Sequence, residues 1–207
     1  SVTNPNFNNS DKSLYVSAEA TENDNYQTFG YKTNKTGISI GTDSLGFIYG
    51  SGYFNNQATF GGITLTNKPL STSGNNKENF VFKMDSSGNV LWAVAGGDLS
   101  GGCCDDRALG MHVTAGGEVF ITGTFWSSYY IDSCSVTQNQ WGTALNAHDN
   151  SLLAKLDTDG NCVWVIGFGA DEGAGSGYNC PYPIYDADDH SYDVKVDKDG
   201  FIYVTGF

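Results

Sequence analysis

Short runs in this chain are apolar at three successive positions, whereas a strand with one exposed face alternates between apolar and polar residues. The runs occupy residues 47–49, 119–121 and 201–203. A strand that is apolar on both sides has to be covered on both faces, so the pattern predicts small sheets stacked face against face. A further short stretch precedes each run across a tight turn, which predicts a strand pair at each place. Those stretches are residues 37–42, 108–113 and 191–196.

The segment from Gly46 to Trp92 occurs again from Gly117 to Trp164, with its ends 46 and 47 positions apart. A third copy begins at Gly200. Bodies of nearly constant length joined by links of different length are typical of a tandem structural repeat. Each full copy closes with two more strands around an Asp- and Gly-containing turn, so we expect units of four antiparallel strands.

Four-stranded units in series describe a β-propeller, and the predicted fold is an all-β propeller fragment. We expect residues 37–96 and 108–167 to superpose as complete blades, with Trp92 and Trp164 in equivalent buried positions. Because two whole blades cannot close a ring, we expect open strand edges and a longer parent protein. The expected parts are an earlier blade's last strand and outgoing loop at 1–36, a blade and link at 37–107, a second blade and long link at 108–190, and two strands of a further blade at 191–207.

The closing segments, residues 80–92 and 152–164, resemble the bacterial β-propeller repeats of the SBBP type, as do residues 47–52 upstream. The resemblance covers roughly residues 37–207 and departs from the family pattern in the long link at 177–190. It implies a propeller scaffold of surface and secreted proteins, and it implies a compartment more than an activity.

The formal net charge of −13 at pH 7 disfavours nucleic acid and anionic membranes as partners. The sequence contains no run of about 18 apolar residues, so it predicts no membrane-spanning helix. Low lysine content, five cysteines without zinc spacing, and glycosylation sequons at Asn8 and Asn34 together favour an extracellular or cell-surface location. The expected partners are proteins or further copies, joined through missing chain segments, with carbohydrate as a second class.

Carboxylates and aromatic side chains crowd the links that the strand order places on one rim of the propeller. Such a rim could bind calcium, a carbohydrate or a cationic partner. The alternative is a set of solvated acidic loops that keep a secreted protein in solution. The residues selected for the binding hypothesis are Asp105, Asp106, Asp186, Asp188, Asp189, Trp126, Tyr178 and Tyr182.

The turn that contains Asp157 and Asp159 resembles the start of a calcium loop but lacks the later bidentate glutamate. A plain hairpin turn is the alternative there, so no cofactor is expected, and calcium is the one metal that the pattern allows. Ser-His-Asp, P-loop and dinucleotide motifs are absent from the sequence, and its three histidines share no metal spacing. We therefore do not expect an enzyme.

The expected strand directions place four cysteines on one rim and Cys162, at the start of a fourth strand, on the opposite one. A disulfide needs Cα atoms about 4.4–6.8 Å apart, which is far less than the height of a blade. Cys162 should therefore be a free buried thiol or pair outside the fragment. The expected disulfide cysteines are Cys103, Cys104, Cys134 and Cys180.

These patterns favour a non-enzymatic structural or adhesive propeller module of a larger surface or appendage protein. A carbohydrate- or calcium-binding module is the alternative hypothesis. A propeller enzyme with catalytic residues outside this fragment is the third.

Overall fold

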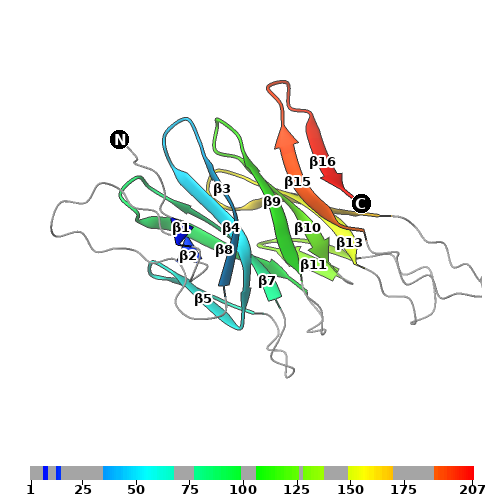
Figure 1. Cartoon of the computed structure of the whole chain (residues 1–207), viewed down its shortest axis with the longest axis horizontal. Helices are drawn as coiled ribbons and strands as arrows, with labels where there is room; N and C mark the ends of the chain where they lie inside the picture. Colours follow the sequence, from blue (N-terminus) through cyan, green and yellow to red (C-terminus); the bar gives the residue numbers. More distant parts are fainter. Residues whose placement is uncertain are drawn as a thin grey trace, which may run out of the picture.

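The computed structural model covers the whole chain and describes residues 7–8, 13–14, 35–67, 77–98, 106–125, 128–137, 149–169 and 189–207. Every regular element in these ranges is a β-strand (Figure 1), which confirms the all-β prediction. Within the same ranges no helix is long and apolar enough to cross a membrane.

Two groups of four strands form the body of the structure, and in each group sequential strands are antiparallel neighbours. Unit 1 consists of β3 (Lys35–Thr42), β4 (Ile48–Asn55), β7 (Lys77–Met84) and β8 (Val90–Gly97). Unit 2 consists of β9 (Arg107–Val113), β10 (Val119–Phe125), β13 (Asn150–Leu156) and β14 (Cys162–Phe168). The predicted four-stranded antiparallel units and their strand directions are confirmed.

Shorter strand pairs accompany the two units. They are β1 (Phe7–Asn8) with β2 (Ser13–Leu14), β5 (Gln57–Phe60) with β6 (Ile63–Thr66), β11 (Ser128–Ile131) with β12 (Cys134–Thr137), and β15 (Ser191–Val196) with β16 (Ile202–Gly206). The hairpin β11–β12 leaves unit 2 but pairs with unit 1, because β11 lies beside β8. The sheet of unit 1 therefore has six strands, in the order β12-β11-β8-β7-β4-β3.

Side chains of the second strand in each unit pack on both faces of the sheet, as the unbroken apolar runs predict. In unit 2, Val119 and Ile121 belong to the large apolar cluster that unit 1 shares, whereas Phe120 packs in a separate cluster with Val194 of β15. In unit 1, Tyr49 joins the shared cluster, and Ile48 packs on the cluster that the β5–β6 hairpin completes. The units are therefore layers that need a neighbour on each side.

The two closing tryptophans occupy equivalent positions. Trp92 is paired with Lys83 across the strands and meets the Tyr49 ring edge-on, with ring centroids 6.0 Å apart. Trp164 is paired with Lys155 and meets Phe120 in the same way at 6.1 Å. Both indoles are half-buried rather than buried, because each lies at the margin of its cluster.

The first strands of successive units lie side by side, with β9 between β3 and β15 (Figure 1). This is the arrangement expected around a propeller axis, but the described residues form no closed ring. The open strand edges and the longer parent protein stay predictions.

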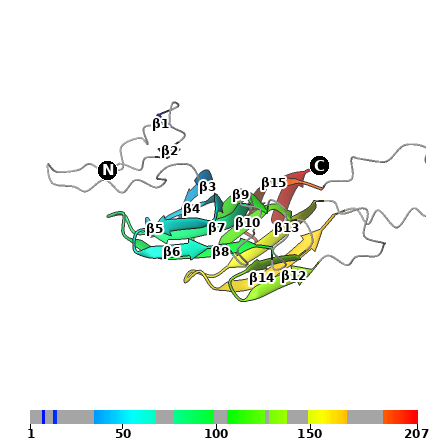
Figure 2. The ribbon, with the colours of Figure 1, turned by 90° about the horizontal axis from the view of Figure 1, so that it is seen from below.

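The expected role of Cys162 is wrong. Its sulfur is bonded to that of Cys134, with Cα atoms 5.8 Å apart. The strand directions are as expected, so the error lies in the course of the connection between β10 and β13. Residues 128–137 of that connection fold back as β11–β12, and Figure 2 shows β12 beside β14. The hairpin thereby carries Cys134 to the start of β14. Cys103, Cys104 and Cys180 lie outside the described residues.

Replacing Cys134 and Cys162 together by serine should lower the free energy of unfolding by about 2–4 kcal/mol, because the bond closes a loop with a sequence separation of 28. Guanidinium unfolding of the oxidised protein and the double variant measures the difference. Dithiothreitol should bring the oxidised protein to the level of the double variant. A midpoint that neither change moves would contradict the bond.

Candidate functional site

Polar side chains are buried where the link between the two units leaves the sheets. We call this group the junction cluster; its members are Glu78, Asn79, Asp98, Asp106, Ser128, Tyr129 and Tyr130. Asp106, one of the predicted rim residues, is 1% exposed, and its backbone amide donates to the carbonyl of Lys77 at 3.0 Å. The residue is therefore enclosed by the protein and not exposed on an open rim, and a binding role for it stays a prediction.

Asn79 connects three segments of the chain. Its Nδ2 donates to the Tyr129 hydroxyl of β11 at 2.9 Å, and its Oδ1 accepts from the backbone amide of Ala108 in β9. Asn79 itself lies on β7 and is fully buried. One amide side chain therefore links the third strand of unit 1, the first strand of unit 2 and the hairpin β11–β12. We call β11–β12 the crossing hairpin, because it leaves unit 2 and pairs with unit 1.

Two carboxylates of unit 1 accept hydrogen bonds from the same hairpin. The Tyr130 hydroxyl donates to Glu78 Oε2 at 3.1 Å, and Ser128 Oγ donates to Asp98 Oδ1 at 2.8 Å. Burial, followed by the charge and hydrogen bond of Glu78, raises the pKa of Tyr130 far above its ordinary value. Burial likewise raises the pKa of Tyr129. Both phenols keep their protons at physiological pH, so the Tyr130 hydroxyl remains a donor to Glu78 while the Tyr129 hydroxyl accepts from Asn79.

Aspartates at the opposite end of the sheets close the hairpin turns. Asp157 Oδ1 accepts from the backbone amides of Asp159 and Asn161, each at 2.9 Å, and the Asn161 side chain binds the same carboxylate. Asp85 makes the equivalent bonds in unit 1. Gly88 and Gly160 each take a φ of 86° three residues after the aspartate, a conformation that glycine adopts without strain. These contacts favour the plain-turn reading of Asp157 and Asp159.

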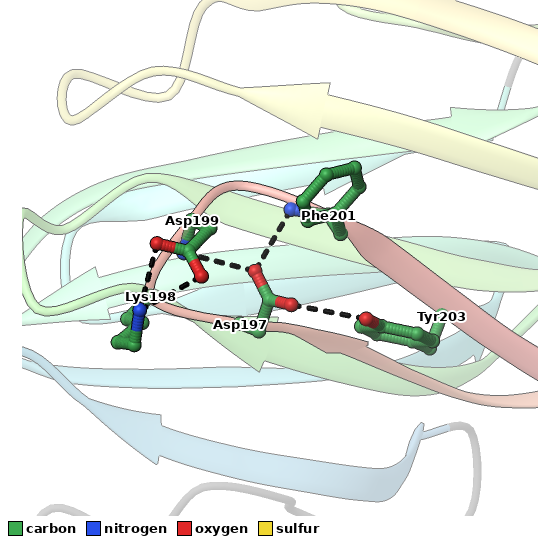
Figure 3. Close-up of polar contacts among 5 residues, drawn as sticks. All are labelled: Asp197, Lys198, Asp199, Phe201 and Tyr203. Carbon is green, nitrogen blue, oxygen red and sulfur yellow. Dashed lines mark hydrogen bonds and ion pairs between the residues drawn. The ribbon is translucent and has the colours of Figure 1, made fainter.

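A second family of turns uses tyrosine as well. Figure 3 shows Asp197 with Oδ1 accepting from the Asp199 and Phe201 amides, while the Tyr203 hydroxyl donates to Oδ2 at 3.0 Å. Asp43 and Tyr49 repeat this arrangement at 2.9 Å. Burial opposes ionisation of Asp197, but these hydrogen bonds outweigh it and lower the pKa of the carboxyl. Its oxygens are therefore occupied by the turn. Across the described ranges, no group of three or more His, Cys, Asp or Glu residues could hold a metal.

The turns of unit 2 also accept hydrogen bonds from side-chain and backbone donors of unit 1. Trp92 Nε1 and Lys83 Nζ both donate to the carbonyl oxygen of Thr158, at 3.0 and 3.2 Å. The backbone amide and the hydroxyl of Ser44 donate to the carbonyl of Ala115, at 3.1 and 2.7 Å. The two units are therefore joined at both ends of their sheets, by the junction cluster at one end and by these four bonds at the other.

Of the other residues predicted for a binding or glycosylation site, the structure describes Asp189 and Asn8. Asp189 is half-buried, and its backbone amide donates to the carbonyl of Asp149 at 2.8 Å. Asn8 lies in β1, where its glycosylation stays a prediction. Six rim residues and one sequon lie outside the described part of the chain: Asp105, Asp186, Asp188, Trp126, Tyr178, Tyr182 and Asn34.

Sequence reasoning missed Asn79 and the crossing hairpin. A signal for the hairpin was present, because residues 57–66 and 128–137 correspond at an offset of 71 positions, the same offset that relates Gly46 to Gly117. The equivalence places Asp132, with a φ of 51°, where the first copy has Gly61 with a φ of 56°. Both hairpins therefore close with a residue in the left-handed backbone conformation at the same position of the turn.

Replacing Asn79 by alanine should lower the free energy of unfolding by about 2–4 kcal/mol, since it leaves the Tyr129 hydroxyl and the Ala108 amide buried without their partner. The matched control is Ser151→Ala, at the equivalent position of unit 2, which should cost less than about 1 kcal/mol. Urea unfolding measures both. Equal decreases in the free energy of unfolding for the two variants would show that Asn79 does not stabilise the junction between the units.

Replacing Asp157 by asparagine should make the free energy of unfolding less dependent on pH between pH 7 and pH 3. The Asn161 side-chain amide, and then its backbone amide, lower the pKa of the Asp157 carboxyl. A lowered folded-state pKa adds stability that is complete above the unfolded value of about 3.9 and is lost as the pH falls through the folded-state value. Because the carboxyl lies near the surface, we expect a deficit under about 1 kcal/mol at pH 7 that shrinks toward zero near pH 3.

Urea unfolding of the Asp157→Asn variant at pH 7, 5 and 3 measures this trend against the unmodified protein. Asp159→Asn, at the exposed neighbouring position, is the control and should leave the stability unchanged at each pH. A deficit of the Asp157→Asn variant that grows under acid would overturn the assignment.

No family model and no curated protein matches this sequence. The resemblance to SBBP-type repeats therefore stays a prediction based on its own motif residues. What the chain can do has to be inferred from the geometry of the two joined units.

Proposed function

We propose that this chain is a non-enzymatic, extracellular structural or adhesive module in which successive four-stranded units are joined into one rigid body. The observation that carries the proposal is the crossing of β11–β12 from unit 2 into the sheet of unit 1. Strand pairing across a repeat boundary ties the two units more firmly than packing of faces alone, because backbone hydrogen bonds and buried apolar surface have to be lost together.

The chemistry of the described polar groups supports a scaffold role. The junction carboxylates are buried against serine and tyrosine donors, and the turn aspartates are occupied by backbone amides. Groups satisfied in this way stabilise one conformation and leave little capacity for a substrate. A propeller arrangement and kinship with SBBP-type repeats are part of the same proposal.

The disulfide and the charge support the proposed compartment. Disulfides persist in oxidising environments such as the extracellular space, and Cys134–Cys162 closes the loop between the hairpin and β14. A net charge of −13 favours solubility and opposes binding to other anionic surfaces.

Pulling the chain from its two ends in a force spectrometer tests the proposal. We expect both units to unfold in one event, because the crossing hairpin and Asn79 join them. In the oxidised protein that event should release about 90–100 Å less chain than after reduction, since the disulfide with its sequence separation of 28 keeps that length closed.

Separate unfolding events for residues 37–98 and 106–169 would contradict the rigid-body proposal. The Asn79→Ala variant is the matched control and should unfold at lower force with the same released length. Calcium titration by thermal shift and a glycan array on the same preparation test the competing binding module; a specific response in either would replace the scaffold role by a ligand-binding one.

A further inference from the structure

The last strand of unit 2 differs from its counterpart in unit 1 at one end. Across the strands, Gly96 of β8 is paired with Asn79, and Phe168 of β14 is paired with Ser151, so Gly96 and Phe168 occupy equivalent positions. In unit 1 this strand end is covered by β11, which pairs Ile131 with Gly96. Within the described residues, β14 pairs with β13 alone and is the edge of its sheet.

Solvent exposure also differs between the covered end of β8 and the uncovered end of β14. Gly96 and Gly97 are buried at the end of β8, whereas Phe168 is 40% exposed and Ile166 is 48% exposed at the end of β14. Two neighbouring large apolar side chains on an edge strand are a surface that natural proteins usually cover. The covered edge of β8 shows what kind of element fits there.

The β8 edge selects its hairpin by side-chain size. The Tyr129 hydroxyl lies over Gly96, and a Cβ atom added to Gly96 would come within 2.5 Å of it. Asn79, the cross-strand neighbour of Gly96, donates to the same hydroxyl. Glycine at position 96 and asparagine at position 79 therefore match a tyrosine at the second position of the docked hairpin.

At the β14 edge both selecting residues are different. Phe168 stands in place of Gly96, and Ser151 in place of Asn79. A large side chain at position 168 occupies the space that a tyrosine of the hairpin would need, so the matching hairpin has a small residue there. The β5–β6 hairpin has this pattern, because Ala58 corresponds to Tyr129 at the offset of 71 positions.

We propose that the exposed end of β14, residues 166–168, is the docking site for the β5–β6 hairpin of a second copy of this chain, with the small residue Ala58 facing Phe168. The hairpin adds to the sheet of unit 2 as β11–β12 adds to that of unit 1, by edge-strand pairing whose specificity comes from alternate side chains. The inference rests on strand registers and residue sizes and not on the proposed scaffold role, so that either can fail without the other.

The experiment uses the full chain and a cyclised, fluorescently labelled peptide of residues 56–67, whose ends are joined in the structure by the Asn67 amide donating to the Asn56 carbonyl at 3.0 Å. Fluorescence anisotropy gives its affinity, and hydrogen exchange of the full chain locates the binding. We expect protection of the amides at 166–168. A peptide with Ala58→Tyr should bind at least about tenfold more weakly, because it overpacks against Phe168.

A Phe168→Gly variant of the full chain should reverse this preference and bind the Ala58→Tyr peptide more tightly. Val163→Gly, at the other end of the same strand and also exposed, is the matched control and should keep the original order. Retention of the Cys134–Cys162 bond and of the unfolding midpoint checks that each variant folds. Because the preference is a ratio of two affinities for one receptor, a general loss of stability does not imitate the reversal.

Equal affinity for the two peptides, or protection confined to β3 or β16, would overturn the proposal. If the chain associates with itself at high concentration and the peptide displaces that association, the hairpin of a second copy is the occupant, which supports the proposal. Self-association that the peptide does not displace, together with no peptide binding, would overturn it.

Discussion

Coverage of both faces of each sheet is the constraint on which the rest of this structure depends. Phe120 and Ile121 are neighbours in β10, yet they belong to different apolar clusters on opposite sides of unit 2. A sheet with two apolar faces exposes one of them unless another layer packs there. The shared cluster between the units, the β5–β6 hairpin on one side and β15 on the other all meet this requirement.

Much of this architecture could be predicted from the sequence, because its signals are local. The apolar runs at 47–49 and 119–121, and the aspartate and glycine of each turn, fix strand and turn positions through backbone geometry alone. The equivalence of Trp92 and Trp164 follows from spacing. The half-burial of both indoles does not, since it depends on how far the neighbouring layer extends.

The parts that could not be predicted depend on where a connection goes after it leaves its strand. Nothing in the local pattern of residues 128–137 indicates that β11 pairs with β8 of the preceding unit. That course decides the partner of Cys162, which was expected to be free or to pair outside the fragment. Long-range strand pairing is set by competition among edges, and the edge of β8 is available only once unit 1 has formed.

The crossing hairpin also determines the order in which the sheets can be completed during translation. The sheet of unit 1 ends its own strands at Gly97 but is completed only when Thr137 has been synthesised, 40 residues later. At about 5–20 residues per second, the ribosome leaves the β8 edge without its final partner for about 2–8 seconds. Glycines at positions 96 and 97 offer little side-chain surface to a wrong strand in that interval. The sheet of unit 1 is thus complete only after part of unit 2 has been synthesised.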